Sequence, residues 1–223
     1  MFLGHFAVGM AAKRMAPRTS AGALILGATF LDLLWPILLL LGVETVRIVP
    51  GITKTSPFDF VSYPWSHSLL MAIVWSLMIG HLYRMRTGNV KGGLVVSLCV
   101  VSHWVLDVLV HRPDLPLVPW GGPKVGLGIW NSLWGTLALE GAMFVAGIAI
   151  YVRTTRARDR VGSIAFWCFV GFLALAYFAS SSAPPPPNAA AIAISDLALW
   201  LLVLWAWWFD RHRVVRTEVA VPG

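Results

Sequence analysis

Charged residues are scarce in this sequence. Asp, Glu, Lys and Arg make up 12% of its 223 residues, whereas hydrophobic residues make up 58%. A soluble globular domain carries about 25% charged residues, so this composition excludes an ordinary soluble domain. Together with a mean hydropathy of +0.75, it predicts a polytopic membrane protein whose chemistry, if it has any, takes place in or beside the bilayer.

Cysteine is almost absent as well. Cys99 and Cys168 both lie inside apolar runs and form no CxxC pair, which argues against a disulfide framework and a cysteine-ligated structural zinc site. The HEXXH, GXSXG, P-loop and GxGxxG patterns are also missing. The sequence therefore offers no standard motif of a zinc protease, a serine hydrolase or a nucleotide-binding protein.

Acidic residues are fewer than basic ones, 10 against 17, which gives a formal net charge of +7. The basic residues lie in short clusters between apolar runs, at 13–18, 84–91, 153–160 and 211–216. These clusters fall on every second connection, and the positive-inside rule places them in the cytoplasm. The loops 42–64, 112–128 and 181–188 are then predicted to face outward, and the C-terminus to be cytoplasmic.

Six apolar runs are about long enough to cross a bilayer, which needs ~20 residues. A shorter run at 1–16 is predicted to be a re-entrant or half-inserted helix. The expected fold class is therefore all-α, a polytopic membrane helix bundle of six transmembrane helices plus this short N-terminal helix, in one domain over 1–223. The expected spans are 21–41, 65–83, 92–110, 129–152, 161–180 and 189–209.

The third of these spans carries three ionisable side chains spaced four residues apart, His103, Asp107 and His111. At ~100° per residue they share one helix face. Ionisable groups at membrane depth are costly and usually face a partner, a cavity or an ion. The stripe therefore indicates a metal or proton site, although a stripe that only holds helices together would give the same pattern.

Other segments contribute ionisable side chains at a similar depth. From ~1.5 Å of rise per residue, six side chains share a band between the midplane and the outer surface, so we expect one common site open to the outer side. Imidazole and carboxylate without thiolate suit Zn²⁺, Mn²⁺ or Fe²⁺, and an open metal site can supply hydroxide at neutral pH. His103, Asp107 and Glu140 are the candidate catalytic residues. The six side chains that share this depth are His5, Asp32, His67, His103, Asp107 and Glu140.

Four short motifs carry a resemblance to a family. Gly4-His5, FLD ending at Asp32, SHSL at 66–69 and SHWVLD at 102–107 occur in the same order and at similar intervals as in the predicted inner-membrane metal-dependent hydrolases of bacteria. Those proteins are regarded as distant, membrane-embedded relatives of the zinc phospholipase C and P1-type nuclease group. The resemblance covers about 1–119, so this half would hold the metal site and 129–209 would add three further spans. It implies a bacterial inner-membrane hydrolase with the metal ligands His5, Asp32, His67, His103 and Asp107.

The chain departs from this family at two motifs. Members often show D-I-D-H where residues 32–35 read DLLW, and H-R-G-F-T-H-S where residues 62–68 read SYPWSHS. The missing acid and histidines imply one divalent metal, Zn²⁺ first and Mn²⁺ or Fe²⁺ as alternatives, rather than a multi-metal cluster. His111 and Asp114 are possible additional ligands, and they or Glu140 could substitute for the missing groups.

Three functions are compatible with these features. The leading hypothesis is a metal-dependent hydrolase acting on a phosphoester or lipid-like substrate near the outer leaflet. The alternative is a cation- or proton-coupled transporter or permease that uses the same residues. A third is a non-catalytic membrane protein. The expected partners are the lipid bilayer and a small-molecule or lipid-like substrate, and no nucleic acid is expected.

Overall fold

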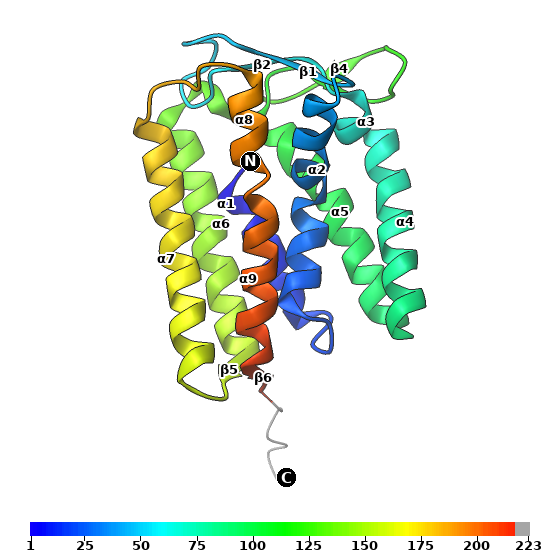
Figure 1. Cartoon of the computed structure of the whole chain (residues 1–223), viewed down its shortest axis with the longest axis vertical. Coiled ribbons are helices and arrows are strands. Elements are labelled where there is room, and N and C mark those ends of the chain that lie inside the picture. Colours follow the sequence, from blue (N-terminus) through cyan, green and yellow to red (C-terminus); the bar gives the residue numbers. More distant parts are fainter. Residues whose placement is uncertain (217–223) are drawn as a thin grey trace.

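The computed structural model describes residues 1–216 and is a helix bundle with short strand pairs at its two ends (Figure 1). The all-α bundle expected from the sequence is therefore observed. The long helices are α2 (Ala21–Leu40), α4 (Leu69–Thr87), α5 (Val90–Val110), α6 (Leu133–Thr154), α7 (Arg160–Ser182) and α9 (Leu199–Arg211). The short ones are α1 (Leu3–Ala11), α3 (Pro64–His67) and α8 (Ala189–Asp196), with the 3-10 turns η1 (Ala12–Arg14) and η2 (Ile129–Asn131).

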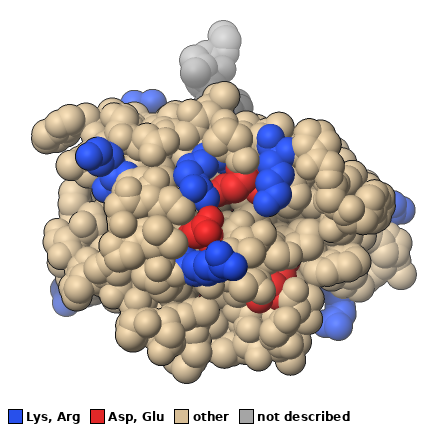
Figure 2. Space-filling model, turned by 90° about the horizontal axis from the view of Figure 1, so that it is seen from above, with Lys and Arg blue, Asp and Glu red and all other residues tan. Residues whose placement is uncertain are grey.

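Three antiparallel strand pairs lie at the ends of the bundle. One end, here called the loop end, carries β1 (Thr45–Ile48) paired with β2 (Phe58–Ser62), and β3 (Leu115–Pro116) paired with β4 (Lys124–Val125) (Figure 1). The opposite end, here called the basic end, carries β5 (Thr155–Ala157) paired with β6 (Arg213–Val215). Seen from above, the loop end shows Lys and Arg side chains, some of them beside acidic ones (Figure 2). There Arg112 pairs with Asp59 at 2.8 Å.

Five helices are long and apolar enough to cross a membrane, namely α2, α5, α6, α7 and the continuous stretch Ala189–Arg211 formed by α8 and α9. They indicate a membrane protein. The predicted span 65–83 corresponds to α3 and α4, and α4 is not among the five because His81, Arg84 and Arg86 make its last turns more polar. The predicted helix 189–209 is interrupted at Leu197 and Ala198, where it divides into α8 and α9.

Most of these helices begin at a residue that can accept a hydrogen bond from the first turn. At each of these positions the side-chain oxygen accepts the backbone N–H three residues later, which satisfies one of the N–H groups that have no partner within the helix. The residues are Ser20 before α2, Ser68 before α4, Asn89 before α5, Ser132 before α6, Asp159 before α7 and Asn188 before α8.

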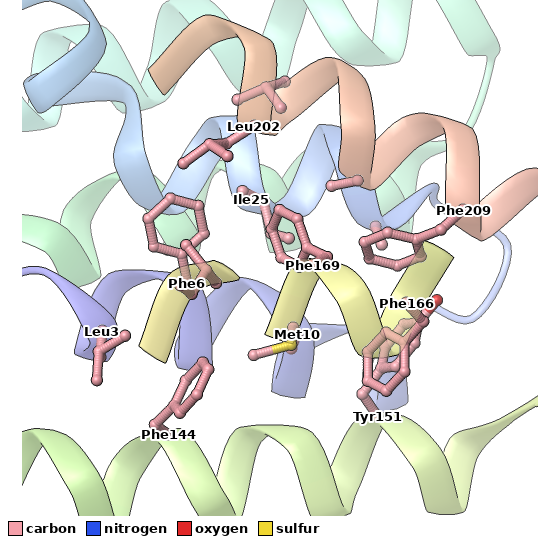
Figure 3. Packing of buried hydrophobic residues seen from close by; sticks show 14 of the residues in the cluster. Leu3, Phe6, Met10, Ile25, Phe144, Tyr151, Phe166, Phe169, Leu202 and Phe209 are labelled. Carbon is pink, nitrogen blue, oxygen red and sulfur yellow. The ribbon is translucent and has the colours of Figure 1, made fainter. Parts of the chain in front are cut away.

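The short helix α1 lies inside the bundle rather than on its surface. Its side chains Leu3, Phe6 and Met10 belong to the largest apolar cluster, together with residues of α2, α6, α7 and α9 (Figure 3). Two glycines allow this close packing. Gly9 faces the backbone of Ile25 on α2, and Gly147 on α6 faces the backbone of Ala7. A side chain at either position would push α1 out of place.

A buried ion pair secures α1 at the basic end. Lys13, in the η1 turn that continues α1, lies 2.7 Å from Asp210 on α9. Asp210 also accepts hydrogen bonds from the Tyr151 hydroxyl at 2.6 Å and from the Ala21 N–H at 2.9 Å. A buried charge is tolerated when it is paired and hydrogen-bonded, so this group of residues ties α1 to α2, α6 and α9.

Replacing Gly147 with Ala should destabilise the fold, whereas the same change at Gly141 should not. A Cβ at 147 would lie 2.6 Å from the Ala7 carbonyl oxygen, while one at 141 would meet nothing within 4 Å. Overpacking costs about 1–3 kcal/mol, and Ala in an open helix position gains about 0.5–1 kcal/mol over Gly. Thermal unfolding in detergent should give a lower midpoint for Gly147→Ala and an equal or higher one for Gly141→Ala. Equal midpoints would contradict the packing of α1 against α6.

Candidate metal centre

Four helices bring the five expected metal ligands together inside the bundle. His5 comes from α1, Asp32 from α2 and His67 from α3, while His103 and Asp107 lie one turn apart on α5. Two overlapping groups have ligand atoms within 4.8 Å of one another, His5 with His103 and Asp107, and Asp32 with His67 and His103. This buried His/Asp cluster could hold a metal ion.

Each of the two carboxylates lies within 4.0 Å of all three imidazoles, but they differ in exposure. Asp107 is almost fully buried, with Oδ1 3.1 Å from His5 Nε2 and Oδ2 3.1 Å from His103 Nε2. Asp32 Oδ1 lies 3.4 Å from His67 Nε2 and 3.5 Å from His103 Nε2. The Asp32 side chain is 31% exposed, against 2% for Asp107. Asp32 is therefore the carboxylate that faces open space.

The protonation of His103 follows from its surroundings. Its Nδ1 lies 2.8 Å from the carbonyl oxygen of Ala28, and a carbonyl can only accept, so Nδ1 carries a ring proton. The Nε2 atom is directed at the carboxylates of Asp32 and Asp107. It is fully buried and makes no hydrogen bond within the described residues 1–216. A buried polar atom without a partner is costly, and either a second ring proton or a bound metal ion would satisfy it.

His67 is oriented by a second acid that the sequence did not reveal. The Ser66 hydroxyl lies 2.7 Å from Glu44 Oε2 and 2.7 Å from His67 Nδ1. Because the hydroxyl donates to the carboxylate, it accepts from the Nδ1–H of His67, so Nε2 is the ring nitrogen that faces the cluster. Glu44 also accepts the backbone N–H groups of Trp65 and Ser66, both at 2.8 Å. Such carboxylate support is typical of metal-ligating histidines.

The third imidazole, His5, is held mainly by contacts with its neighbours in the cluster. Its ring stacks on that of His103 with the centroids 3.6 Å apart. The Met1 amino nitrogen, two residues before α1, lies 2.7 Å from Asp107 Oδ1. The position of α1 in the bundle therefore decides whether this imidazole reaches the cluster.

Glu140, expected to be catalytic, has a role at the start of α1. Its Oε2 accepts the backbone N–H groups of Phe2, Leu3 and Gly4 at 2.9, 2.7 and 3.4 Å. The first N–H groups of a helix lack partners within the helix and favour a negative charge. Glu140 is only 1% exposed, so it is a buried cap supplied by another helix, and it positions His5 indirectly.

His111 and Asp114, considered as additional ligands, belong to a separate group at the loop end. His111 Nδ1 lies 3.1 Å from Asp114 Oδ1, and the Tyr63 hydroxyl donates to the same oxygen at 3.1 Å. Arg112 Nε donates to Asp114 Oδ2 at 3.4 Å. Burial lowers the pKa of His111, partly offset by its hydrogen bond with Asp114. Among the described residues, neither side chain joins the groups of metal-ligand atoms.

A cavity of about 640 Å³ connects the cluster with the loop end. Its lining includes Asp32, His67 and Asp107 of the cluster, together with His111, Glu140 and several aromatic side chains. Residues of the segments 50–58 and 180–186, which belong to the loop end, also line it. The expected opening of the site toward the loops at 42–64 and 181–188 matches this geometry.

Comparison with known proteins gives no match to a family model, a curated protein or a solved structure. The assignment of this site therefore depends on its own geometry and chemistry. The resemblance to inner-membrane hydrolases stays an expectation from short motifs.

Replacing Glu140 with Ala should loosen the start of α1. The N–H groups of residues 2–4 would lose their acceptor in a buried position, which costs about 1–3 kcal/mol. Glu140→Gln keeps a carbonyl acceptor and should cost less. Thermal unfolding measures the loss, and hydrogen exchange at Leu3 and Gly4 locates it. If those amides stay as protected in Glu140→Ala as in the unchanged protein, the cap is not what holds α1.

Proposed function

We propose that the protein is a membrane-embedded, metal-dependent hydrolase. In this proposal one divalent ion is held by the cluster of His5, Asp32, His67, His103 and Asp107, with Zn²⁺ as the first candidate and Mn²⁺ or Fe²⁺ as alternatives. The observation that carries the proposal is the convergence of three imidazoles and two carboxylates in two overlapping groups, each with its ligand atoms within 4.8 Å of one another. His67 and His103 each have Nδ1 beside an oxygen atom outside the cluster, so their Nε2 atoms face its carboxylates and can ligate.

The donor set fits a reactive rather than a closed structural site. Structural zinc sites are commonly built with thiolates, whereas imidazole and carboxylate with an open side are typical of catalytic ones. When bound there, a divalent metal would lower the pKa of water and polarise a phosphoryl or carbonyl oxygen. Asp107 and His103 form the buried side of the cluster, and Asp32 presents its carboxylate to the cavity. Glu140 lines the same cavity while it holds α1.

The cavity supports a phosphoester or lipid-like substrate. Its volume of about 640 Å³ lies within the ~300–1,000 Å³ range of sites that bind small organic ligands. Aromatic side chains of Trp35, Phe60 and Trp130 line it beside the polar groups, so it can accept a molecule with one apolar and one polar part.

For the membrane we propose that α4 is a sixth span, that α1 is half-inserted, and that the basic end is cytoplasmic. The support is the distribution of charge. The clusters at 13–18, 84–91, 153–160 and 211–216 all belong to turns at the basic end, and Lys and Arg are enriched on the cytoplasmic side of membrane proteins. The resemblance described above favours the inner membrane of a bacterium.

This arrangement is tested by labelling single cysteines in whole cells with a membrane-impermeant maleimide, in a Cys99→Ala, Cys168→Ala background. Cysteines placed at Arg86, Arg156 and Arg216 should react only after the cells are opened, whereas one placed at Gly121 should react in intact cells. The reverse pattern would mean that the protein has the opposite orientation. Labelling of both the Arg86 and the Gly121 positions in intact cells would show that α4 and α5 do not cross.

The metal itself is tested by elemental analysis of protein purified in detergent without chelators. The unchanged protein should hold roughly one equivalent of a divalent metal, and Asp107→Asn should lose most of it, because the change removes a ligand charge while nearly keeping the shape. His81→Gln is the matched control, since His81 is exposed on α4 far along the chain from the cluster.

Two results would contradict the metal site. One is an unchanged protein with less than about a tenth of an equivalent, since an imidazole–carboxylate site of this kind binds tightly at neutral pH. The other is a full equivalent retained by Asp107→Asn. Transport of a cation or proton through the same cluster would then be the better explanation.

A further inference from the structure

Residues of α7 and of α8 with the start of α9 line the same cavity. Tyr177, Ser180 and Ser181 line it from α7, and Ile192, Ser195 and Leu199 line it from α8 and α9. Residues spaced three and four apart share one face of a helix, so Tyr177, Ser180 and Ser181 form one face of α7, and Ile192 and Ser195 form one face of α8. The cavity therefore occupies the space between α7 and α8 instead of lying behind them.

The chain keeps these two helices apart. α7 packs along α9, while α8 packs against α2, so the outer ends of α7 and α8 diverge (Figure 1). The connection between them contains four consecutive prolines, Pro184–Pro187, and such a run is a stiff, extended spacer of ~3.1 Å per residue. Its first three prolines line the cavity.

The gap opens sideways, toward the surroundings of the bundle. Ser180, Ser181 and Ser195 are exposed as well as lining the cavity. On the neighbouring outward faces of the same helices, Phe178 is 59% and Ile194 64% exposed. Both helices belong to apolar stretches long enough to span a membrane, so large apolar side chains on these faces fit contact with lipid. A polar opening between apolar flanks would therefore face the bilayer.

The inner end of the same space is the metal-ligand cluster. The cavity continues from the two helix faces past Phe2 and Glu140 to Asp32 and Asp107. Asp196, in the wall, makes its one hydrogen bond within residues 1–216 with the adjacent Ser195 at 3.4 Å. It is thus available to an N–H or O–H donor of a ligand. Lys54 lines the opposite side near the loops.

We propose that the gap between α7 and α8 is a lateral portal through which a single phospholipid of the surrounding leaflet enters headgroup first. The phosphate reaches the cluster, a hydroxyl or ammonium of the headgroup meets Asp196, and the acyl chains stay between the outer faces of the two helices. About 640 Å³ is room for a small organic ligand, hence for a headgroup and its first methylenes. The contact of the phosphate with a metal rests on the proposed function, whereas the portal does not.

The portal is tested by photocrosslinking of the full chain in nanodiscs. The probe is a phosphatidylethanolamine that carries a diazirine on the acyl carbons next to the glycerol, and mass spectrometry locates the labelled residues. We expect label on Tyr177 and Ile192, which face the cavity, in addition to residues on the outside of the bundle. A glycerol phosphate analogue with a diazirine and no acyl chain should label these positions at least about tenfold less at equal concentration, because it lacks the chains that hold the probe in the bilayer.

Two adjacent positions give a matched pair of variants. Ser195→Trp fills the portal and should lower the label on Tyr177 about tenfold, which corresponds to a tenfold loss of occupancy. Ile194→Trp adds the same side chain on the lipid-facing side and should leave this label unchanged. Ser181→Trp, from the opposite wall, repeats the test if Ser195→Trp does not fold.

The outcomes separate the portal from the proposed function. No label on Tyr177 and Ile192 in the unchanged protein, or equal label in Ser195→Trp, Ser181→Trp and Ile194→Trp, would overturn the portal whatever the metal content. Label that persists in Asp107→Asn supports the portal even when that variant has lost its metal. Stronger labelling by the chainless analogue would show a soluble phosphoester as the occupant and would overturn the lipid.

Discussion

The structure depends on the burial of a helix too short to cross the bundle. The first N–H groups of such a helix end inside the bundle and lack partners within the helix, so they require an acceptor from elsewhere in the chain. Glu140 supplies it. The backbone also needs room, which Gly9 and Gly147 provide, and the other end needs a neutralised charge, which Lys13 and Asp210 provide. His5 reaches the cluster because all three conditions are met.

The hydrogen bonds around the cluster decide what the cluster can bind. The Nδ1–H of His103 donates a hydrogen bond to a main-chain carbonyl oxygen. The Nδ1–H of His67 donates one to the hydroxyl of Ser66, which itself donates to Glu44. Both partners lie outside the cluster, so both rings are already turned with Nε2 toward Asp32 and Asp107. Neither ring has to turn before it can ligate a metal ion.

The helical bundle could be predicted because apolar runs of spanning length set the helices, and the spacing of His103 and Asp107 sets one face. His5, Asp32 and His67 were added by their estimated depth and by the resemblance of short motifs, not by a local pattern. The hydrogen bond of Glu44 with Ser66 could not be predicted, since an acidic residue in a loop follows no periodic pattern and Ser66 is 22 residues away in the sequence. Glu140 lay at the expected depth, but its face on α6, not its depth, made it a cap instead of a ligand. The interruption at Leu197 and Ala198 could not be predicted either, because the run 189–209 is mostly apolar and contains no proline or glycine that would mark a break.

That interruption has a place in the architecture. Irregular backbone at membrane depth is tolerated where it is buried in protein or lines a cavity. Here the break follows Asp196 directly, on the wall of the cavity. Both α8 and α9 pack against α2, which carries Asp32, and α9 also packs along α7. The wall of the opening that α8 forms therefore lies next to a ligand of the candidate metal centre. Access to the cluster and construction of the cluster are therefore consequences of the same helix packing.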